Sequence, residues 1–401
     1  MAVTPPALVG RDQWLADFRI SIEMARRREP PKAAMVLLGV RGVGKTVLLE
    51  QFILAARAAD FAALRLVVDP DPDRSLAVQL AEDMPRLIDQ LHDKSRKVRA
   101  RRGELTGAKP FIKAGPLSGE VSAAPVVNHP ANLAAVVRHL NEHALHTDRS
   151  VAIMVDELQD ATLSDLRAFA RVIDLTAAEN MPIVLVGAGL PALQMRAPEV
   201  GATSFTERAD WSEVPFLTPA QTREAIDAPA QSNGARFEPA ALDTLVTETR
   251  GYPYLIQVLG SHAWECSGDQ TVITLDHART AIAKAQAQLD KGLYGLRWNK
   301  CTPRERTVLT AMAVLERDTG SPIVQLADIA RLLMVPANKL STQRDSLIRK
   351  ELVEPVNRGQ LQFTLPGMAE SIIRTTSIST AQQLAKPTAR VDKPLPKQLR
   401  P

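Results

Sequence analysis

The residues best suited to chemistry lie in a short glycine-rich stretch near the start of the chain. Gly39, Gly44, Lys45 and Thr46 have the spacing G-x-x-x-x-G-K-[ST] of a phosphate-binding loop. Its glycines let several backbone N–H groups point at one spot, and the following helix turns its N-terminal dipole end toward an anion. Lys45 is expected to reach the β- and γ-phosphates of ATP, and Thr46 to place its hydroxyl on Mg²⁺. The predicted cofactor-binding residues of this loop are Gly39, Val40, Arg41, Gly42, Val43, Gly44, Lys45, Thr46 and Val47.

A pair of carboxylates is the second chemical signal. Five apolar residues, 151–155, predict a strand buried on both faces, and Asp156 and Glu157 follow it directly. Because the C-terminal ends of parallel strands meet at one ligand crevice, these acids should arrive beside the phosphate loop. Asp156 is expected to join Thr46 in the metal shell, and Glu157 to polarise the attacking water as general base. Together with Lys45, Glu157 therefore predicts hydrolysis of ATP to ADP and phosphate.

The elements that must position these residues alternate between strands and helices. Apolar runs of strand length cover 34–38, 64–68, 151–157, 182–189 and 211–216, and helical periodicity covers 14–22, 47–53, 75–91, 131–146 and 163–178. Such alternation predicts an α/β fold with a mostly parallel sheet flanked by helices. We expect residues 1–220 to form this nucleotide-binding core, and Thr218-Pro219 to start the next helix.

Helical segments dominate the second half of the chain. Helices at 239–249, 254–265 and 275–290 predict a helical lid over residues 221–295. Residues 296–375 predict a winged helix-turn-helix, with one helix after Thr302-Pro303, two more at 323–333 and 338–350, and strands at 352–355 and 361–364. The last segment, 376–401, is too polar and too rich in proline to bury a core, so a disordered basic tail is expected.

The third helix of this module carries the candidate nucleic-acid contacts. In a winged helix that helix enters the major groove of double-stranded DNA, and the wing touches the backbone. Basic and amide side chains predicted to point outward are Lys339, Gln343, Arg349, Lys350 and, at the wing tip, Arg358. From Asn299 onward the chain has 16 Lys and Arg against 9 Asp and Glu, which fits an acidic partner but also a solvated basic surface. A winged helix that contacts protein is the alternative.

A basic run interrupts the core between 94 and 113, where seven Lys and Arg residues precede Lys113 against a single acid, Glu104. It belongs to a predicted insertion of about 94–125 that lacks helical periodicity. An exposed solvated loop is the expected structure, and a DNA-contacting loop is the alternative.

Composition limits the class of protein. The chain has 401 residues, of which 45% are apolar and 23% charged, which is typical of a soluble globular protein with two or three domains. No apolar run approaches the roughly 20 residues that a membrane helix needs, and the first residues lack a hydrophobic signal core. Two cysteines suit a reducing compartment, so a cytoplasmic location without membrane attachment is expected.

Taken in order, residues 8–374 resemble the AAA+ ATPases of the replication-initiator (origin-recognition) type and their relatives among the STAND regulatory NTPases. The resemblance rests most on Gly39–Thr46 and on the strand that ends in Asp156-Glu157. It implies that Val9, Gly10 and Arg11 lie near the adenine. It also implies a polar sensor residue at the end of the strand 182–189, but Gly187-Ala188-Gly189 has no polar side chain there.

Two further positions depart from or extend the family pattern. Tyr254 stands where initiators often carry a sensor arginine, which leaves that sensor absent or supplied by Arg250. Arg208 stands where related proteins keep an arginine finger, so it either completes the site of a neighbouring copy in a homo-oligomer or forms a surface ion pair. These departures imply slow or conditional hydrolysis.

The resemblance implies a protein that binds ATP with Mg²⁺, hydrolyses it to ADP, and uses its nucleotide state to control DNA binding through the winged helix. The alternative function is a STAND-like signalling switch whose winged helix contacts another protein.

Overall fold

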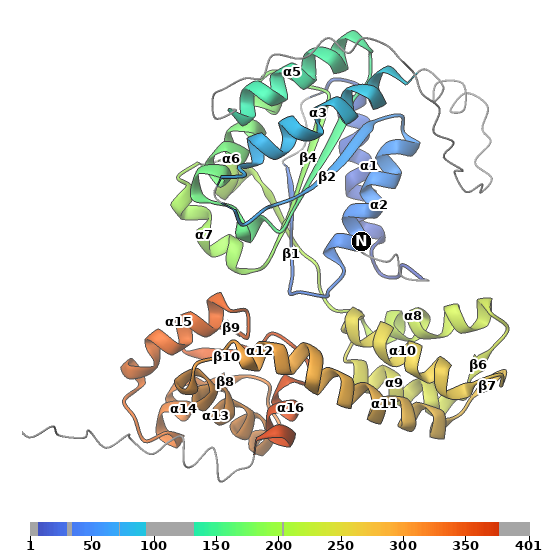
Figure 1. Cartoon of the computed structure of the whole chain (residues 1–401), viewed down its shortest axis with the longest axis vertical. Helices are drawn as coiled ribbons and strands as arrows, with labels where there is room; N and C mark the ends of the chain where they lie inside the picture. Colours follow the sequence, from blue (N-terminus) through green and yellow to red (C-terminus); the bar gives the residue numbers. More distant parts are fainter. Residues whose placement is uncertain (1–6, 30–33, 72, 94–131, 203, 377–401) are drawn as a thin grey trace, which may run out of the picture. The chain divides into compact units, whose positions relative to one another are not determined.

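The computed structural model describes residues 7–29, 34–71, 73–93, 132–202 and 204–376 (Figure 1). The chain divides into two compact units, one made of Met1–Gly234 and Gly251–Gln257, the other of Ala235–Arg250 and Val258–Pro401. The predicted basic insertion at 94–125 and, apart from Thr376, the predicted tail lie outside the described residues. The division into core, lid, winged helix and tail stays a prediction.

The first unit is built on a five-stranded parallel sheet. Its strands are β1 (Met35–Leu38), β2 (Ala62–Val67), β3 (Val151–Asp156), β4 (Ile183–Gly189) and β5 (Asp210–Glu213), in the order β2-β3-β4-β1-β5. Register pairs Leu38 with Gly189 and Val67 with Asp156, so these strands end at the same edge. The predicted α/β fold with a parallel sheet is confirmed.

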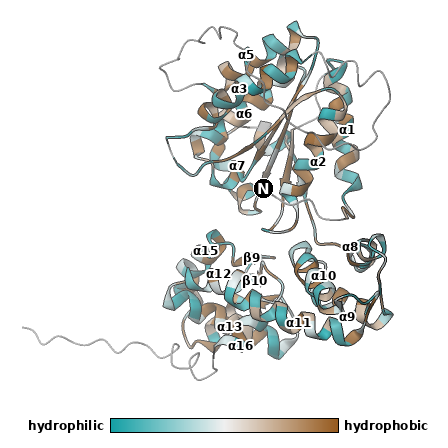
Figure 2. Ribbon diagram, turned by 45° about the vertical axis from the view of Figure 1, so that its right-hand side comes forward, coloured by the Kyte–Doolittle hydropathy of each residue, from teal (hydrophilic) through white to brown (hydrophobic). Residues whose placement is uncertain are grey.

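Helices cover both faces of this sheet (Figure 1). One face packs against α1 (Asp12–Arg26) and α2 (Lys45–Ala58). The other packs against α3 (Leu76–His92), α5 (Leu133–His146), α6 (Leu163–Ala178) and α7 (Ala192–Val200). Figure 2 shows the central strands in the colour of hydrophobic residues. All six residues of β3 are buried, as expected for a strand with helices on both sides.

Local capping fixes where several helices begin. Ser75, Thr162 and Thr218 each accept a backbone hydrogen bond at the N-cap of α3, α6 and α8 (Pro219–Ser232). The predicted start at Thr218-Pro219 is confirmed. Short elements were not predicted: α7, the turns η1 (Leu158–Asp160) and η2 (Ser204–Arg208), and the two-residue strands β6 (Arg236–Phe237) and β7 (Val272–Ile273), which pair with each other in parallel.

The second unit is mainly helical. Its longer helices are α9 (Pro239–Thr249), α10 (Pro253–Ser267, of which the residues up to Gln257 belong to the first unit), α11 (Leu275–Leu289), α13 (Pro303–Thr319), α15 (Ser341–Arg349) and α16 (Met368–Thr375). Shorter pieces are η3 (Asp290–Tyr294), α12 (Gly295–Asn299), α14 (Leu326–Leu332) and η4 (Ala337–Leu340).

A three-stranded antiparallel sheet completes this unit, with β8 (Val324–Gln325), β10 (Gln360–Phe363) and β9 (Val353–Pro355) in that order. The predicted hairpin is confirmed, since Leu361 pairs with Pro355 and Phe363 with Val353. The helix predicted over 323–333 was too long at its start, because Val324 pairs with Leu361 and α14 begins only at Leu326. Among the described helices, none combines the length and the apolar character needed to cross a bilayer.

Candidate nucleotide-binding site

The glycine-rich stretch forms the turn between β1 and α2. Gly42 and Gly44 have φ of 79° and 102°, the left-handed region that favours glycine, and α2 starts at the next residue, Lys45. The Lys45 ammonium is buried and donates to the carbonyl oxygens of Gly39 (2.6 Å) and Val40 (3.2 Å). The loop therefore curls around its own lysine, as a phosphate loop must if its backbone N–H groups are to face one ligand.

The two predicted acids arrive beside this loop. The Thr46 hydroxyl donates to Asp156 Oδ2 over 2.9 Å, although the two residues lie 110 positions apart in sequence. Asp156 is 2% exposed, and its Oδ1 accepts the backbone N–H of Glu157 over 3.0 Å. The structure therefore places Thr46, Asp156 and Glu157 next to one another at the carboxyl edge of the sheet.

An arginine that sequence reasoning missed joins this group. Arg65 Nη1 lies 3.2 Å from Asp156 Oδ2, and its Nε lies 3.1 Å from Glu50 Oε1. Its signal in the sequence is a single basic residue inside the apolar strand β2. Arg65 thus neutralises the buried carboxylate when no other cation is present.

A pocket of about 370 Å³ opens over the loop. Of the predicted residues, Val9, Arg11, residues 41–47 and Glu157 line it, whereas Gly10, Gly39, Val40 and Asp156 do not. Further walls that were not predicted come from Ala7, Leu8, Leu217, Ala225, Pro253, Tyr254, Ile256 and Gln257. The apolar walls and the polar floor suit a ligand with an aromatic part and a phosphate part.

Arg11 holds the first segment of the chain against the loop. Its Nη2 donates to the carbonyl oxygens of Val43 (3.0 Å) and Pro215 (3.1 Å), and its guanidinium lies 5.6 Å from the ring centre of Trp14. Burial lowers the pKa of this guanidinium to about 10. Gly10 (φ 67°) leaves room for Gln221, whose side chain would lie 2.6 Å from any added Cβ.

A second missed residue, Tyr252, reaches the loop from the turn before α10. Its hydroxyl donates to the Arg41 carbonyl over 2.6 Å, and a Cβ added at Gly42 would lie 2.5 Å from that hydroxyl. Tyr254, at the expected sensor position, lines the pocket. Arg250, the alternative sensor, forms an ion pair with Glu370 within the second unit.

Glu157 carries an unusual backbone and a close partner. It has φ of 58°, a left-handed conformation that is uncommon for a residue with a side chain. Gln159 Nε2 donates to Glu157 Oε2 over 2.6 Å, and no sequence pattern pointed to this glutamine. Burial first, and then the charge of Glu157, raise the pKa of the nearby Asp160.

Arg208 does not reach this pocket. It is exposed at the end of η2, and it lines a smaller pocket with Ala34 and Met35, at the opposite end of β1 from the phosphate loop. If Arg208 acts on a nucleotide, that nucleotide is not the one in its own pocket.

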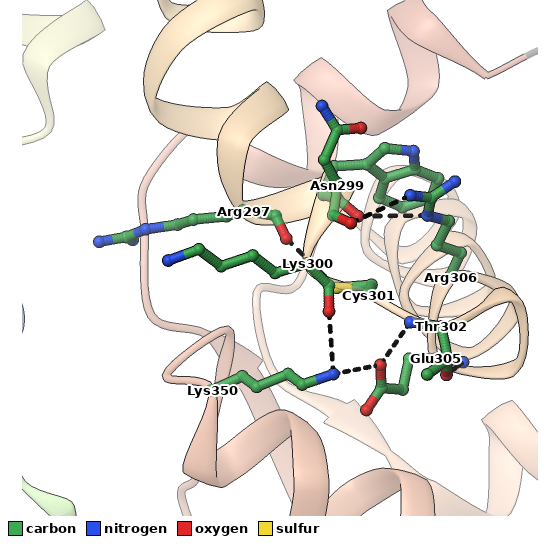
Figure 3. A network of polar contacts seen from close by, with 9 residues as sticks. Arg297, Asn299, Lys300, Cys301, Thr302, Glu305, Arg306 and Lys350 are labelled. Carbon is green, nitrogen blue, oxygen red and sulfur yellow. Dashed lines mark hydrogen bonds and ion pairs between the residues drawn. The ribbon is translucent and has the colours of Figure 1, made fainter.

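The predicted DNA contacts divide into two groups. Lys339, Arg349 and Arg358 are exposed, and Gln343 is half-buried. Lys350 instead donates to Glu305 Oε2 (2.6 Å) and to the Lys300 carbonyl (3.0 Å), as Figure 3 shows. The ammonium of Lys350 therefore compensates a buried carboxylate, and the assignment of Lys350 to a DNA surface stays a prediction.

A protein-family model described as AAA ATPase domain matches residues 7–186, which lie within the first unit. These residues form an AAA ATPase domain. They include β1 to β3, the first residues of β4, the phosphate loop and the acid pair. A second family model, described as Domain of unknown function (DUF8462), matches residues 291–372.

Solved structures share the fold. The ORC2 protein of Aeropyrum pernix in its ADPNP–ADP complexes has a TM-score of 0.58 at 14% identity, with 96% of each chain covered. Its ADP form has a TM-score of 0.52 at 13% identity, covering 96% of this chain and 95% of that chain. Cdc6p of Pyrobaculum aerophilum has a TM-score of 0.46 at 15% identity, with 96% of each chain covered.

At these identities the likeness is one of fold alone. No curated protein matches the chain.

Proposed function

We propose that this chain binds ATP together with Mg²⁺ and hydrolyses it to ADP and phosphate. The observation that carries the proposal is the convergence of Lys45, Thr46 and Glu157 on one pocket of an AAA ATPase domain, with Asp156 accepting the hydrogen bond of the Thr46 hydroxyl. The ORC2 structures with the same fold are described with ADPNP and ADP, which supports a nucleotide as the ligand.

The residues present fit a magnesium ion. Thr46 offers a hydroxyl and Asp156 a carboxylate, and hard oxygen ligands of this kind are those that Mg²⁺ prefers. When bound, the ion neutralises charge on the β- and γ-phosphate oxygens. Arg65 already pairs with the same carboxylate oxygen, so the site accepts positive charge there.

The chain's own groups supply the remaining steps. Lys45 would exchange the Gly39 and Val40 carbonyls for phosphate oxygens, which attract an ammonium more strongly. Glu157, on the pocket wall, would accept the proton of the water that attacks the γ-phosphorus. Lys45 would thereby stabilise the negative charge that develops on the phosphate oxygens in the transition state, and Glu157 the positive charge that develops on the attacking water.

Two variants test the proposal. Lys45→Ala should abolish binding of a fluorescent ATP analogue, whereas the exposed Lys284→Ala should bind as wild type does. Glu157→Gln should keep nucleotide affinity and release phosphate at least about 100-fold more slowly, whereas the exposed Glu199→Gln should not. Unchanged affinity in Lys45→Ala, or unchanged turnover in Glu157→Gln, would refute the assignment.

We further propose that nucleotide state controls binding of double-stranded DNA through the C-terminal module. Its elements follow the order α13, β8, α14, α15, β9 and β10, which is that of a winged helix whose hairpin β9-β10 forms the wing. Arg349 is exposed on α15, Lys339 is exposed on the turn η4 before it, and Arg358 is exposed at the wing tip. Positive side chains there suit phosphate contacts.

Titration of DNA with the full-length protein at rising salt tests this second proposal. Lys339→Ala, Arg349→Ala and Arg358→Ala should each weaken binding and reduce the magnitude of the log–log salt slope by about 1. Arg279→Ala, on an exposed face of α11, is the control. ATP should change the affinity of wild type but not of Lys45→Ala, and absence of DNA binding at low salt would reject the proposal.

One observation favours the alternative, a STAND-like switch that contacts protein. Met334 is 85% exposed and Val335 is 36% exposed in the turn after α14, and Leu332, the last residue of α14, is 45% exposed. An apolar surface within a helix-turn-helix suits a protein partner. Met334→Ser should leave DNA affinity unchanged under this alternative and reduce it if the turn lies against DNA.

A further inference from the structure

The end of β4, Gly187-Ala188-Gly189, has no polar side chain of its own, and the structure shows what occupies the space beside it. Gln159 Oε1 accepts the backbone N–H of Leu190, just after β4, over 3.1 Å. A Cβ added at Gly189 would lie 3.3 Å from the same Oε1 and 2.8 Å from Leu193 Cδ2. A glutamine from the neighbouring strand's loop therefore fills the place left by a glycine.

The other end of this amide holds two carboxylates. Nε2 donates to Glu157 Oε2 over 2.6 Å and to Asp160 Oδ2 over 3.2 Å. Both amide hydrogens and the amide oxygen thus have partners. The backbone around Gln159 is also fixed, because Arg196 Nη1 donates to the carbonyl oxygens of Gln159 (2.8 Å) and Ala161 (3.1 Å). The side chain links Glu157 to β4 through two direct hydrogen bonds.

We propose that Gln159 is the positioning residue that orients Glu157 for water activation and couples it to the end of β4. This inference rests on the ATPase activity proposed above. Gln159 donates to the Glu157 carboxylate over 2.6 Å, and this hydrogen bond sets the direction of the carboxylate. A general base must be held within hydrogen-bond reach of its water, so a freed carboxylate is a poorer base.

The test compares steady-state ATP hydrolysis of four proteins. Gln159→Ala should lower kcat about tenfold, the rate equivalent of one lost positioning hydrogen bond, with KM and ATP-analogue affinity unchanged. Gln159→Glu should lower kcat further, because it places a third carboxylate beside Glu157 and Asp160. Gln194→Ala, which truncates an exposed glutamine on α7, should behave as wild type.

A double variant separates positioning from a general structural role. If Gln159 acts through Glu157, Glu157→Gln/Gln159→Ala should retain the residual rate of Glu157→Gln alone. The inference would be overturned if the two substitutions lowered kcat additively. It would also be overturned if Gln159→Ala had the kcat of wild type or a higher kcat, since a higher value would mean that Gln159 hinders Glu157. Failure of the proposed function is distinguishable, since Glu157→Gln would then hydrolyse ATP as fast as wild type.

Discussion

At the scale of single residues, the phosphate loop depends on contacts that its motif does not contain. Arg11 holds the carbonyl of Val43 and Tyr252 holds that of Arg41, so two residues of the loop are fixed from outside. A loop that is already in its binding conformation loses less entropy when the ligand arrives. Loss of either contact should therefore lower the affinity for nucleotide.

Tyr252→Phe isolates one of them. It removes the hydroxyl that donates to the Arg41 carbonyl and keeps the ring, so ATP affinity should fall about three- to tenfold, as for one lost hydrogen bond. The matched control is Tyr294→Phe, which removes a 2.6 Å hydrogen bond to the Pro366 carbonyl in the second unit. Equal affinities for both variants, measured with a fluorescent ATP analogue, would exclude a role for the Tyr252 hydroxyl.

The site residues that could be predicted are those whose pattern lies within a short stretch of sequence. Gly39–Thr46 is recognisable because glycines, lysine and threonine stand at fixed spacing, and Asp156-Glu157 because a buried strand must end at the ligand edge. Arg65, Gln159 and Tyr252 were missed for a different reason. Their roles exist only because segments distant in sequence meet: Arg65 of β2 reaches Asp156, Gln159 after β3 reaches the end of β4, and Tyr252 before α10 reaches the phosphate loop.

At the scale of elements, one ion pair holds the predicted recognition helix. Figure 3 shows Lys350, directly after α15, donating to Glu305 in the first turn of α13, where the Thr302 backbone N–H donates as well. The Glu305 side chain is 4% exposed and that of Lys350 is 32% exposed. Burial raises the pKa of Glu305, but hydrogen bonds from Lys350, Ser346 and Thr302 outweigh it and lower the pKa to about 2.

This pair should make the second unit sensitive to acid. The pKa of Glu305 is lower in the folded than in the unfolded state, so its contribution to stability is present above about pH 4.5 and is lost as pH falls toward about 2. Lys350→Ala should lower the free energy of unfolding by about 2–3 kcal/mol at pH 7 by leaving a buried carboxylate unpaired.

Hydrogen-exchange protection of α13 and α15 at pH 7 and pH 3.5 measures both effects. Arg317→Ala, which breaks an exposed pair with Asp318, should change stability by less than about 1 kcal/mol. If the amides of α15 are protected from exchange in Lys350→Ala as well as they are in Arg317→Ala at pH 7, the ion pair between Lys350 and Glu305 does not stabilise α15.

A second carboxylate in the same unit titrates in the opposite sense. Burial and the charge of Glu370 raise the pKa of Glu316 to about 7, while Arg250 opposes them. Because the folded pKa exceeds the unfolded value, stability is greatest below about pH 4.5 and declines as pH rises toward about 7. Glu316→Gln should remove this decline, measured as urea midpoints between pH 5 and pH 8. If the stability of Glu316→Gln declined with rising pH as that of wild type does, another titrating group would be responsible.

The elements themselves were predictable where caps and long periodic runs define them. Thr218 and Thr302, each followed by proline, fixed two helix starts correctly, since a capping box needs only residues three apart. The strand β8 was taken as helix because Val324-Gln325 has no pattern of its own and becomes a strand only by pairing with β10. The helices α7 and α16 are too short for periodicity to stand out.

At the scale of the whole molecule, substitution of Arg208 can test whether one copy of the chain completes the nucleotide site of another. It is exposed at the opposite end of β1 from its own phosphate loop, so a catalytic Arg208 must serve a neighbouring copy. Arg208→Ala and Lys45→Ala should each be inactive alone, and a mixture should recover part of the activity, because one protein supplies the arginine and the other an intact pocket. Phosphate release that does not rise on mixing would leave Arg208 without a role in trans.

The segment Gly251–Gln257 belongs to the first unit, although both stretches that flank it belong to the second. It carries Tyr252, which holds the phosphate loop, and Tyr254, which lines the pocket. A fragment that stops at Gly234 would keep the entire nucleotide motif and still lack one wall of its pocket. The ATPase half of this protein therefore cannot be isolated by a single cut, and a truncated version should bind nucleotide poorly even when it folds.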